Sequence, residues 1–144
     1  MPEHGITITR VFEAPRERLW KEWTEPERFG DWFGGPDAEA SAISMDVREG
    51  GDLRLTMQYG PREIQWKGSY VEVVEPERLV FTISDQPGDE RYELVIVVLT
   101  DLGDGRTEMV FQQRGDMTPE QYERAGRGWS GFFDVIEQRL AAQK

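Results

Sequence analysis

The sequence contains no cysteine, which excludes disulfide bonds, thiolate nucleophiles and cysteine-based metal sites. Its single histidine, His4, lies so close to the N-terminus that we expect neither a catalytic nor a metal-binding role for it. A nucleophile–histidine pair is therefore not expected, and acid–base chemistry would fall to carboxylates, lysines or tyrosines. We accordingly expect no metal ion, no cofactor and no catalytic residue.

Long apolar runs and basic charge are also scarce. No segment approaches the length that spans a membrane, and the first six residues have no signal-peptide core, so we expect a cytoplasmic protein without a membrane span. The 17 basic residues are outnumbered by 28 acidic ones, for a net charge of −11. This charge repels phosphate backbones, so nucleic acid is not expected as a partner. At 144 residues, the chain is predicted to form a single domain over residues 1–144.

The last third of the chain predicts a long amphipathic helix. Thr118, Pro119 and Gln121 form a capping box, with threonine as N-cap and proline at the first helical position. Apolar residues then recur at helical spacing and form one stripe with an aromatic centre. The stripe consists of Tyr122, Ala125, Trp129, Phe132, Phe133, Ile136 and Leu140.

The N-terminal part predicts one strand followed by two short helices. Alternation over residues 6–12 is typical of a strand, and Pro15 suits the first turn of a helix that runs to about Trp23. The sequence Thr-Glu-Pro-Glu at residues 24–27 repeats the capping-box pattern and predicts the second helix. This helix should carry Phe29, Trp32 and Phe33 toward the core.

Nearly all of residues 39–114 reads as strands separated by tight turns. Residues 52–59 alternate cleanly, and after Tyr70 the apolar positions switch parity, which predicts a bulge or a strongly coiled strand. Residues 92–100 are apolar on both parities, as in a central strand covered on both sides or a strand at an interface. The element order predicts an α+β helix-grip fold: a curved antiparallel sheet of about six to seven strands wrapped on the C-terminal helix, with two short helices after the first strand.

A set of aromatic and apolar residues falls on faces predicted to point inward. These candidate cavity residues are Trp32, Phe33, Leu55, Met57, Trp66, Tyr70, Phe81, Tyr92, Phe111, Trp129, Phe132 and Phe133. They either fill the core, which patterning alone favours, or line a cavity for an apolar or aromatic ligand. In the second case the polar anchors would be Tyr59, Tyr70, Tyr92, Arg54 or Gln113.

Three glycines interrupt the predicted C-terminal helix and together cost about 2–3 kcal/mol relative to alanine. Gly126 borders the apolar stripe, where a close backbone approach or a ligand pocket would explain it. Gly128 and Gly131 fit a kink or hinge better. The glycines therefore keep the cavity hypothesis open.

Several motifs together resemble the START/Bet v-like (SRPBCC) superfamily, in the branch related to the C-terminal domain of the activator of heat-shock protein 90 ATPase. The motifs are residues 8–17, 19–27, 32–36, 50–51, 68–73, 76–82 and 128–129 with the helix that follows. The resemblance covers nearly the whole chain. It implies the helix-grip fold, often with a deep apolar cavity, whereas function varies widely within the superfamily.

Three functions remain in view. The leading hypothesis is non-enzymatic binding of a small hydrophobic or aromatic ligand between the sheet and the C-terminal helix. The second is a protein-interaction module with a largely filled core. Such a module would either act with chaperones or in a stress response, or form a homodimer through the exposed face of residues 92–100. The chain is accordingly expected to be a monomer or a homodimer. The third is a cyclase- or hydrolase-like enzyme that uses a buried carboxylate or tyrosine.

Overall fold

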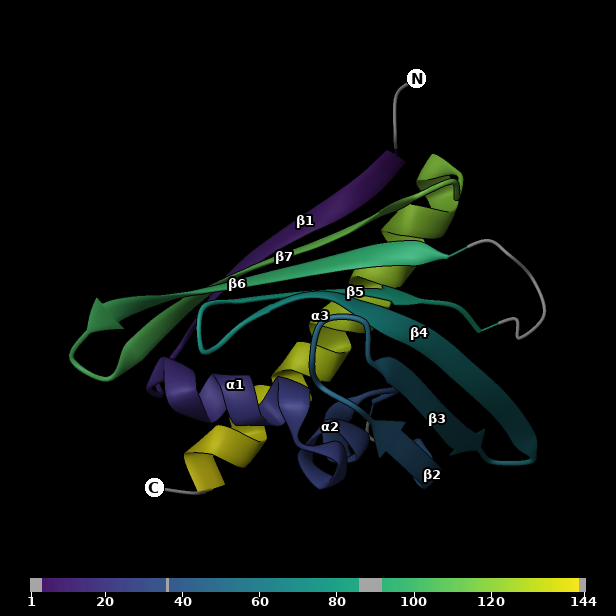
Figure 1. The fold of residues 1–144 in the computed structure, drawn as a ribbon, viewed down its shortest axis with the longest axis horizontal. Coiled ribbons are helices and arrows are strands. Elements are labelled where there is room, and N and C mark those ends of the chain that lie inside the picture. The colour runs from purple at the N-terminus through teal and green to yellow at the C-terminus, as the bar shows by residue number, and fades with distance from the viewer. Residues whose placement is uncertain (1–3, 36, 86–91, 143–144) are drawn as a thin grey trace.

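The computed structural model describes residues 4–35, 37–85 and 92–142. The strands are β1 (His4–Phe12), β2 (Glu39–Met45), β3 (Asp52–Tyr59), β4 (Arg62–Val74), β5 (Arg78–Ile83), β6 (Glu93–Gly103) and β7 (Arg106–Gly115), and the helices are α1 (Arg16–Thr24), α2 (Pro26–Trp32) and α3 (Pro119–Ala142). The strands form one antiparallel sheet in the order β1-β7-β6-β5-β4-β3-β2. The long α3 runs across this sheet, and α1 and α2 lie beside its C-terminal half (Figure 1). The predicted helix-grip architecture is confirmed.

The long strand β4 joins the two parts of the sheet. It pairs with β3 along its first half and with β5 along its second half. The predicted bulge lies at the start of the second half, where the pairing with β5 shifts between Tyr70 and Glu72 and Val71 is exposed. Gly68 lies so close to the carbonyl of Thr82 that no side chain would fit there. The bulge and this close contact let the sheet curl.

Helix α3 begins and packs as its sequence predicts. Thr118 Oγ1 accepts a hydrogen bond from the amide of Gln121 at 3.2 Å, and Gln121 Oε1 accepts one from the amide of Thr118 at 2.8 Å. The apolar stripe is buried except for Ala125 and Phe132, which are half-buried. None of the helices in the described part of the chain is long and apolar enough to cross a membrane.

The second helix forms as predicted, but the capping box proposed for it is wrong. Thr24 is the last residue of α1, and its hydroxyl donates to the carbonyl of Trp20 at 2.8 Å instead of capping α2. Glu25 occupies the N-cap position without a side-chain cap, and Pro26 begins the helix. Proline, with its fixed φ and missing N–H, is compatible with a helix start that has no side-chain cap.

A fully buried carboxylate fastens α3 to the two short helices. Glu22 on α1 accepts a hydrogen bond from Arg139 Nε at 2.7 Å and forms an ion pair with Arg28 on α2 at 3.4 Å. Arg139 also contacts Asp31 at 2.9 Å, and Trp32 Nε1 donates to the carbonyl of Glu22 at 2.8 Å. This network fixes the C-terminal half of α3 against α1 and α2.

Strand β6 is central, as predicted, but it is not covered on both sides. Val95, Val97 and Leu99 are buried beneath the helices, whereas the alternate row of Leu94, Ile96 and Val98 is only half-buried. The second apolar row therefore lies on the outer face of the sheet.

Candidate functional site

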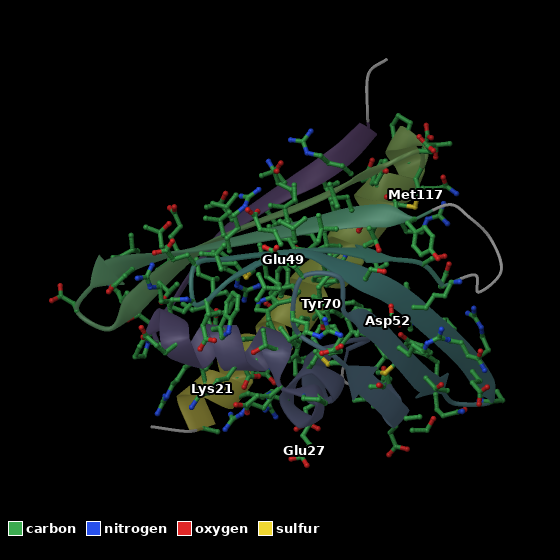
Figure 2. The ribbon with its side chains drawn as sticks, in the orientation of Figure 1. Lys21, Glu27, Glu49, Asp52, Tyr70 and Met117 are labelled. Atoms are coloured by element: carbon green, nitrogen blue, oxygen red, sulfur yellow. The ribbon has the colours of Figure 1, made fainter. Side chains whose placement is uncertain are left out.

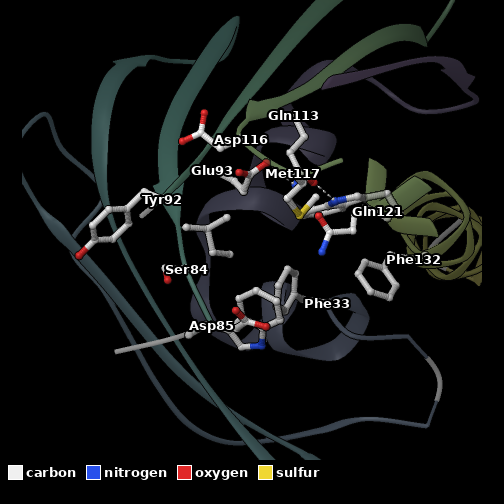
Figure 3. Close-up of a pocket in the computed structure, with 15 residues that line it drawn as sticks. Phe33, Ser84, Asp85, Tyr92, Glu93, Gln113, Asp116, Met117, Gln121 and Phe132 are labelled. Atoms are coloured by element: carbon white, nitrogen blue, oxygen red, sulfur yellow. Dashed lines mark hydrogen bonds between the residues drawn. The ribbon is translucent and has the colours of Figure 1, made fainter. Parts of the chain in front are cut away.

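A pocket of about 470 Å³ lies between the sheet and the N-terminal half of α3 (Figure 3). Strand ends contribute Ile83, Glu93 and Gln113, and the first turns of α3 contribute Gln121, Ala125 and Gly128. The two half-buried members of the helical stripe, Ala125 and Phe132, both border it. Their incomplete burial is therefore explained by the open space beside them.

One side of the pocket is a cluster of aromatic rings. The ring of Phe33, which follows α2, lies 5.3 Å from Trp66, 5.7 Å from Trp129 and 5.7 Å from Phe132, measured between ring centroids. Trp129 and Phe132 lie 5.4 Å apart, with an angle of 67° between their ring planes. Edge-to-face contacts of this kind fix ring positions, so the apolar surface of the pocket is preformed.

A chain of hydrogen bonds crosses the other side. Trp129 Nε1 donates to Gln113 Oε1 at 2.7 Å, and Gln113 Nε2 donates to Glu93 Oε1 at 3.0 Å. The hydroxyl of Tyr122 donates to the same oxygen of Glu93 at 2.7 Å and accepts from the amide of Met117 at 3.3 Å. This Glu93 network joins β6, β7 and α3 and fixes the carboxylate at the edge of the pocket.

The hydroxyl of Tyr122 remains protonated across the ordinary pH range. Burial raises the pKa of Tyr122 above its usual value of 10.0, and its hydrogen bond to Glu93 raises this pKa further. The neutral hydroxyl can therefore donate its hydrogen bond to Glu93 throughout this pH range. Beside the pocket, burial raises the pKa of Tyr59 above its ordinary value, and the contact of its hydroxyl with the indole of Trp66 acts in the opposite direction.

The predicted cavity residues divide into two groups. The structure brings five of them together around the pocket: Phe33, Trp66, Tyr92, Trp129 and Phe132. Tyr92 is 39% exposed and lies at the rim, where Lys67 Nζ is 5.7 Å from its ring centroid. Among the predicted polar anchors, Tyr92 and Gln113 border the pocket.

The other candidates are buried in the core and do not border this pocket. They are Trp32, Leu55, Met57, Tyr70, Phe81, Phe111 and Phe133. Trp23 on α1 lies among several of them, with its ring 6.3 Å from Phe111 and 6.1 Å from Phe133. The side chain of His4 lies outside the described part of the structure.

Sequence reasoning missed several residues of the lining, above all Glu93 and Gly128. Glu93 shares strand parity with Val95 and Val97, so alternation alone places it inward. Helix α3 continues past all three glycines without a break, and a Cβ at Gly128 would meet no atom within 4 Å. Gly128 is thus the glycine at this pocket, whereas a Cβ at Gly126 would contact Ile6 on β1 at 3.7 Å.

Comparison with known proteins identifies the family. The family model described as "Activator of Hsp90 ATPase homolog 1-like protein" matches residues 13–141. The chain belongs to this family. No curated protein matches the sequence significantly.

Similar solved structures share the fold along essentially the whole chain. A protein of unknown function from Staphylococcus aureus has a TM-score of 0.85 at 21% identity, covering 99% of this chain and 98% of its own. The AHSA1 protein from Silicibacter pomeroyi has a TM-score of 0.86 at 18% identity, covering 98% and 100%. A protein from Chromobacterium violaceum has a TM-score of 0.83 at 23% identity, covering 95% and 96%. At these identities the likeness concerns the fold alone.

Proposed function

We propose that this member of the family binds a small hydrophobic or aromatic ligand in the pocket between the sheet and α3, without catalysing a reaction on it. The observation that supports the proposal is the preformed pocket of about 470 Å³, bordered by aromatic rings on one side and by the Glu93 network on the other. Small-molecule sites typically have ~300–1,000 Å³ and combine apolar walls with a few fixed polar groups.

The helix glycine Gly128 adds independent support. Glycine inside a helix costs about 0.8–1 kcal/mol relative to alanine, and here the missing side chain leaves open space that belongs to the pocket. A larger residue would stabilise the helix but occupy this space. The conformational cost of glycine at position 128 is therefore explained if a ligand occupies this space.

The matched variants Gly128→Leu and Gly131→Leu test the proposal. A Cβ at either position meets no atom within 4 Å, but only Gly128 borders the pocket. Both variants should fold, because leucine has a higher helix propensity than glycine. A neutral aromatic probe, naphthylethanol, should raise the Tm of the wild type and of Gly131→Leu in a saturable manner, but not that of Gly128→Leu. An equal shift in all three proteins, or in none, would refute binding in this pocket.

The outer face of the sheet favours a second candidate, a protein-interaction surface. Leu94, Ile96 and Val98 are half-buried on this face, and Val98 pairs with Val110 on β7 and with Arg78 on β5. Arg78 in turn pairs with the exposed Val74 on β4. Contiguous exposed apolar surface is typical of interaction sites. Light scattering across a concentration series should then detect a dimer that Ile96→Lys abolishes, and a strict monomer would count against self-association.

A further inference from the structure

The charged side chains that line the pocket, among the residues that the structure describes, are all acidic. Within the described part of the lining, the charged residues are Glu93, Asp116 and Asp85, and neither lysine nor arginine is among them. Figure 3 shows Glu93 and Asp116 together near Gln113, and Asp85 on the opposite side of the pocket beside Phe33. Both sides of the pocket therefore carry a carboxylate.

These carboxylates do not form a metal site. The described residues contain no group of three or more histidine, cysteine, aspartate or glutamate side chains that could hold a metal ion. The half-buried Glu93 is the best fixed of the three acids, because Gln113 and Tyr122 both donate to its Oε1 and Gly115 packs directly against its Oε2.

The aromatic side of the pocket suits the same ligand class. The faces of tryptophan, tyrosine and phenylalanine rings attract organic cations, and Trp129 is fixed by its hydrogen bond to Gln113. Tyr92 at the rim does not serve this role, because the ammonium group of Lys67 already lies 5.7 Å from its ring centroid. The net charge of −11 also favours a cationic ligand, since it attracts cations and repels anions over a longer range.

From this arrangement we infer that the pocket selects an aromatic or aliphatic amine, with the ammonium group beside Glu93 and the apolar body among the rings, and that it discriminates against carboxylate-bearing ligands such as fatty acids. This inference rests on the proposed function, because it specifies the ligand class of the same pocket. Glu93 would act as the residue that determines specificity for charge.

Three probes with one apolar body test the inference: naphthylethylamine, naphthylethanol and naphthylacetate, which at neutral pH are cationic, neutral and anionic. Isothermal titration calorimetry at low salt and at physiological salt measures each Kd. We expect the amine to bind at least about tenfold more tightly than the acid, with the alcohol between them, because one partly buried charge pair is worth about this factor. Added salt should reduce the difference between the Kd of the amine and the Kd of the acid, because it screens the charges.

Glu93→Gln removes the charge but keeps an oxygen for Tyr122 and Gln113 to donate to. It should reduce the ratio of acid Kd to amine Kd several-fold. The matched control is Glu27→Gln, which removes the same unit of charge from an exposed position on α2, far from Met117 at the pocket (Figure 2). The exposed Asp116→Asn gives a second test that leaves the Glu93 network intact.

The outcomes separate the two claims. If the acid binds as tightly as the amine, the inference is wrong while the proposed pocket stands. If Glu93→Gln and Glu27→Gln change the ratio equally, the specificity role of Glu93 is refuted. If none of the three probes binds, the proposed function and this inference fail together.

Discussion

The buried carboxylate of Glu22 should be among the most sensitive single positions for stability. Glu22→Gln keeps the side-chain volume but removes the charge and presents an amide group to Arg139 and Arg28. Breaking one side of a buried ion pair costs about 3–5 kcal/mol. Here the two arginine side chains are 23% and 37% exposed and keep Asp31 and Glu25 as partners. The cost should therefore be lower, about 2–3 kcal/mol.

Urea denaturation of the wild type and the variant measures this difference. The matched control is Asp134→Asn, because its carboxylate lies 2.6 Å from Arg10 but is 64% exposed. A surface ion pair of this kind contributes about 0–1 kcal/mol, so the control should remain close to the wild type. If Glu22→Gln cost no more than Asp134→Asn, the network at Glu22 would not hold α3 in place, and the reasoning would be refuted.

Two further predictions concern buried hydroxyl groups. Thr107 is fully buried, and its Oγ1 donates to the carbonyl of Ala14 at 2.7 Å. Thr107→Val should lower the free energy of unfolding, measured by urea titration, by about 1–3 kcal/mol, because that carbonyl loses its partner. Thr100→Val, at an exposed position, should lower it little. Because the pKa of Tyr122 is raised in the folded protein, the stability of the fold should depend on pH. The contribution of Tyr122 to stability should be complete below the unfolded-state pKa of about 10. It should be lost as the pH rises from that value toward the higher folded-state pKa. Thermal unfolding between neutral and strongly alkaline pH should show this loss in the wild type and a flatter profile in Tyr122→Phe; identical profiles would contradict it.

The fold could be predicted from local signals that tertiary structure did not override. Strand β3 begins and ends where its alternation does, at Asp52 and Tyr59, and the capping box at Thr118 forms both of its hydrogen bonds. The same motif failed at Thr24, because a threonine hydroxyl can equally bond the carbonyl four residues earlier when it ends a preceding helix. Local pattern does not distinguish these two partners.

The division between core and pocket could not be predicted in the same way. Trp129 and Phe133 lie one helical turn apart on the same stripe, and their rings lie 4.6 Å and 5.2 Å from Phe111, yet only Trp129 borders the pocket. The curvature of the sheet decides which turn of α3 meets open space, and that curvature depends on long-range pairing and on the bulge in β4. Glu93 and Gln113, by contrast, carried a signal in their strand parity.

The indole N–H signals of the five tryptophans offer the most direct test of the pocket. Trp66 and Trp129 border it, whereas Trp32 is buried in the core with its Nε1 bonded to the carbonyl of Glu22 at 2.8 Å. In ¹⁵N-edited NMR spectra, with signals assigned from single Trp→Phe variants, titration with naphthylethanol should shift the indole signals of Trp66 and Trp129 in a saturable manner and leave that of Trp32 in place. Unchanged signals from Trp66 and Trp129 at probe saturation, or shifts confined to the other tryptophans, would contradict ligand binding at this site.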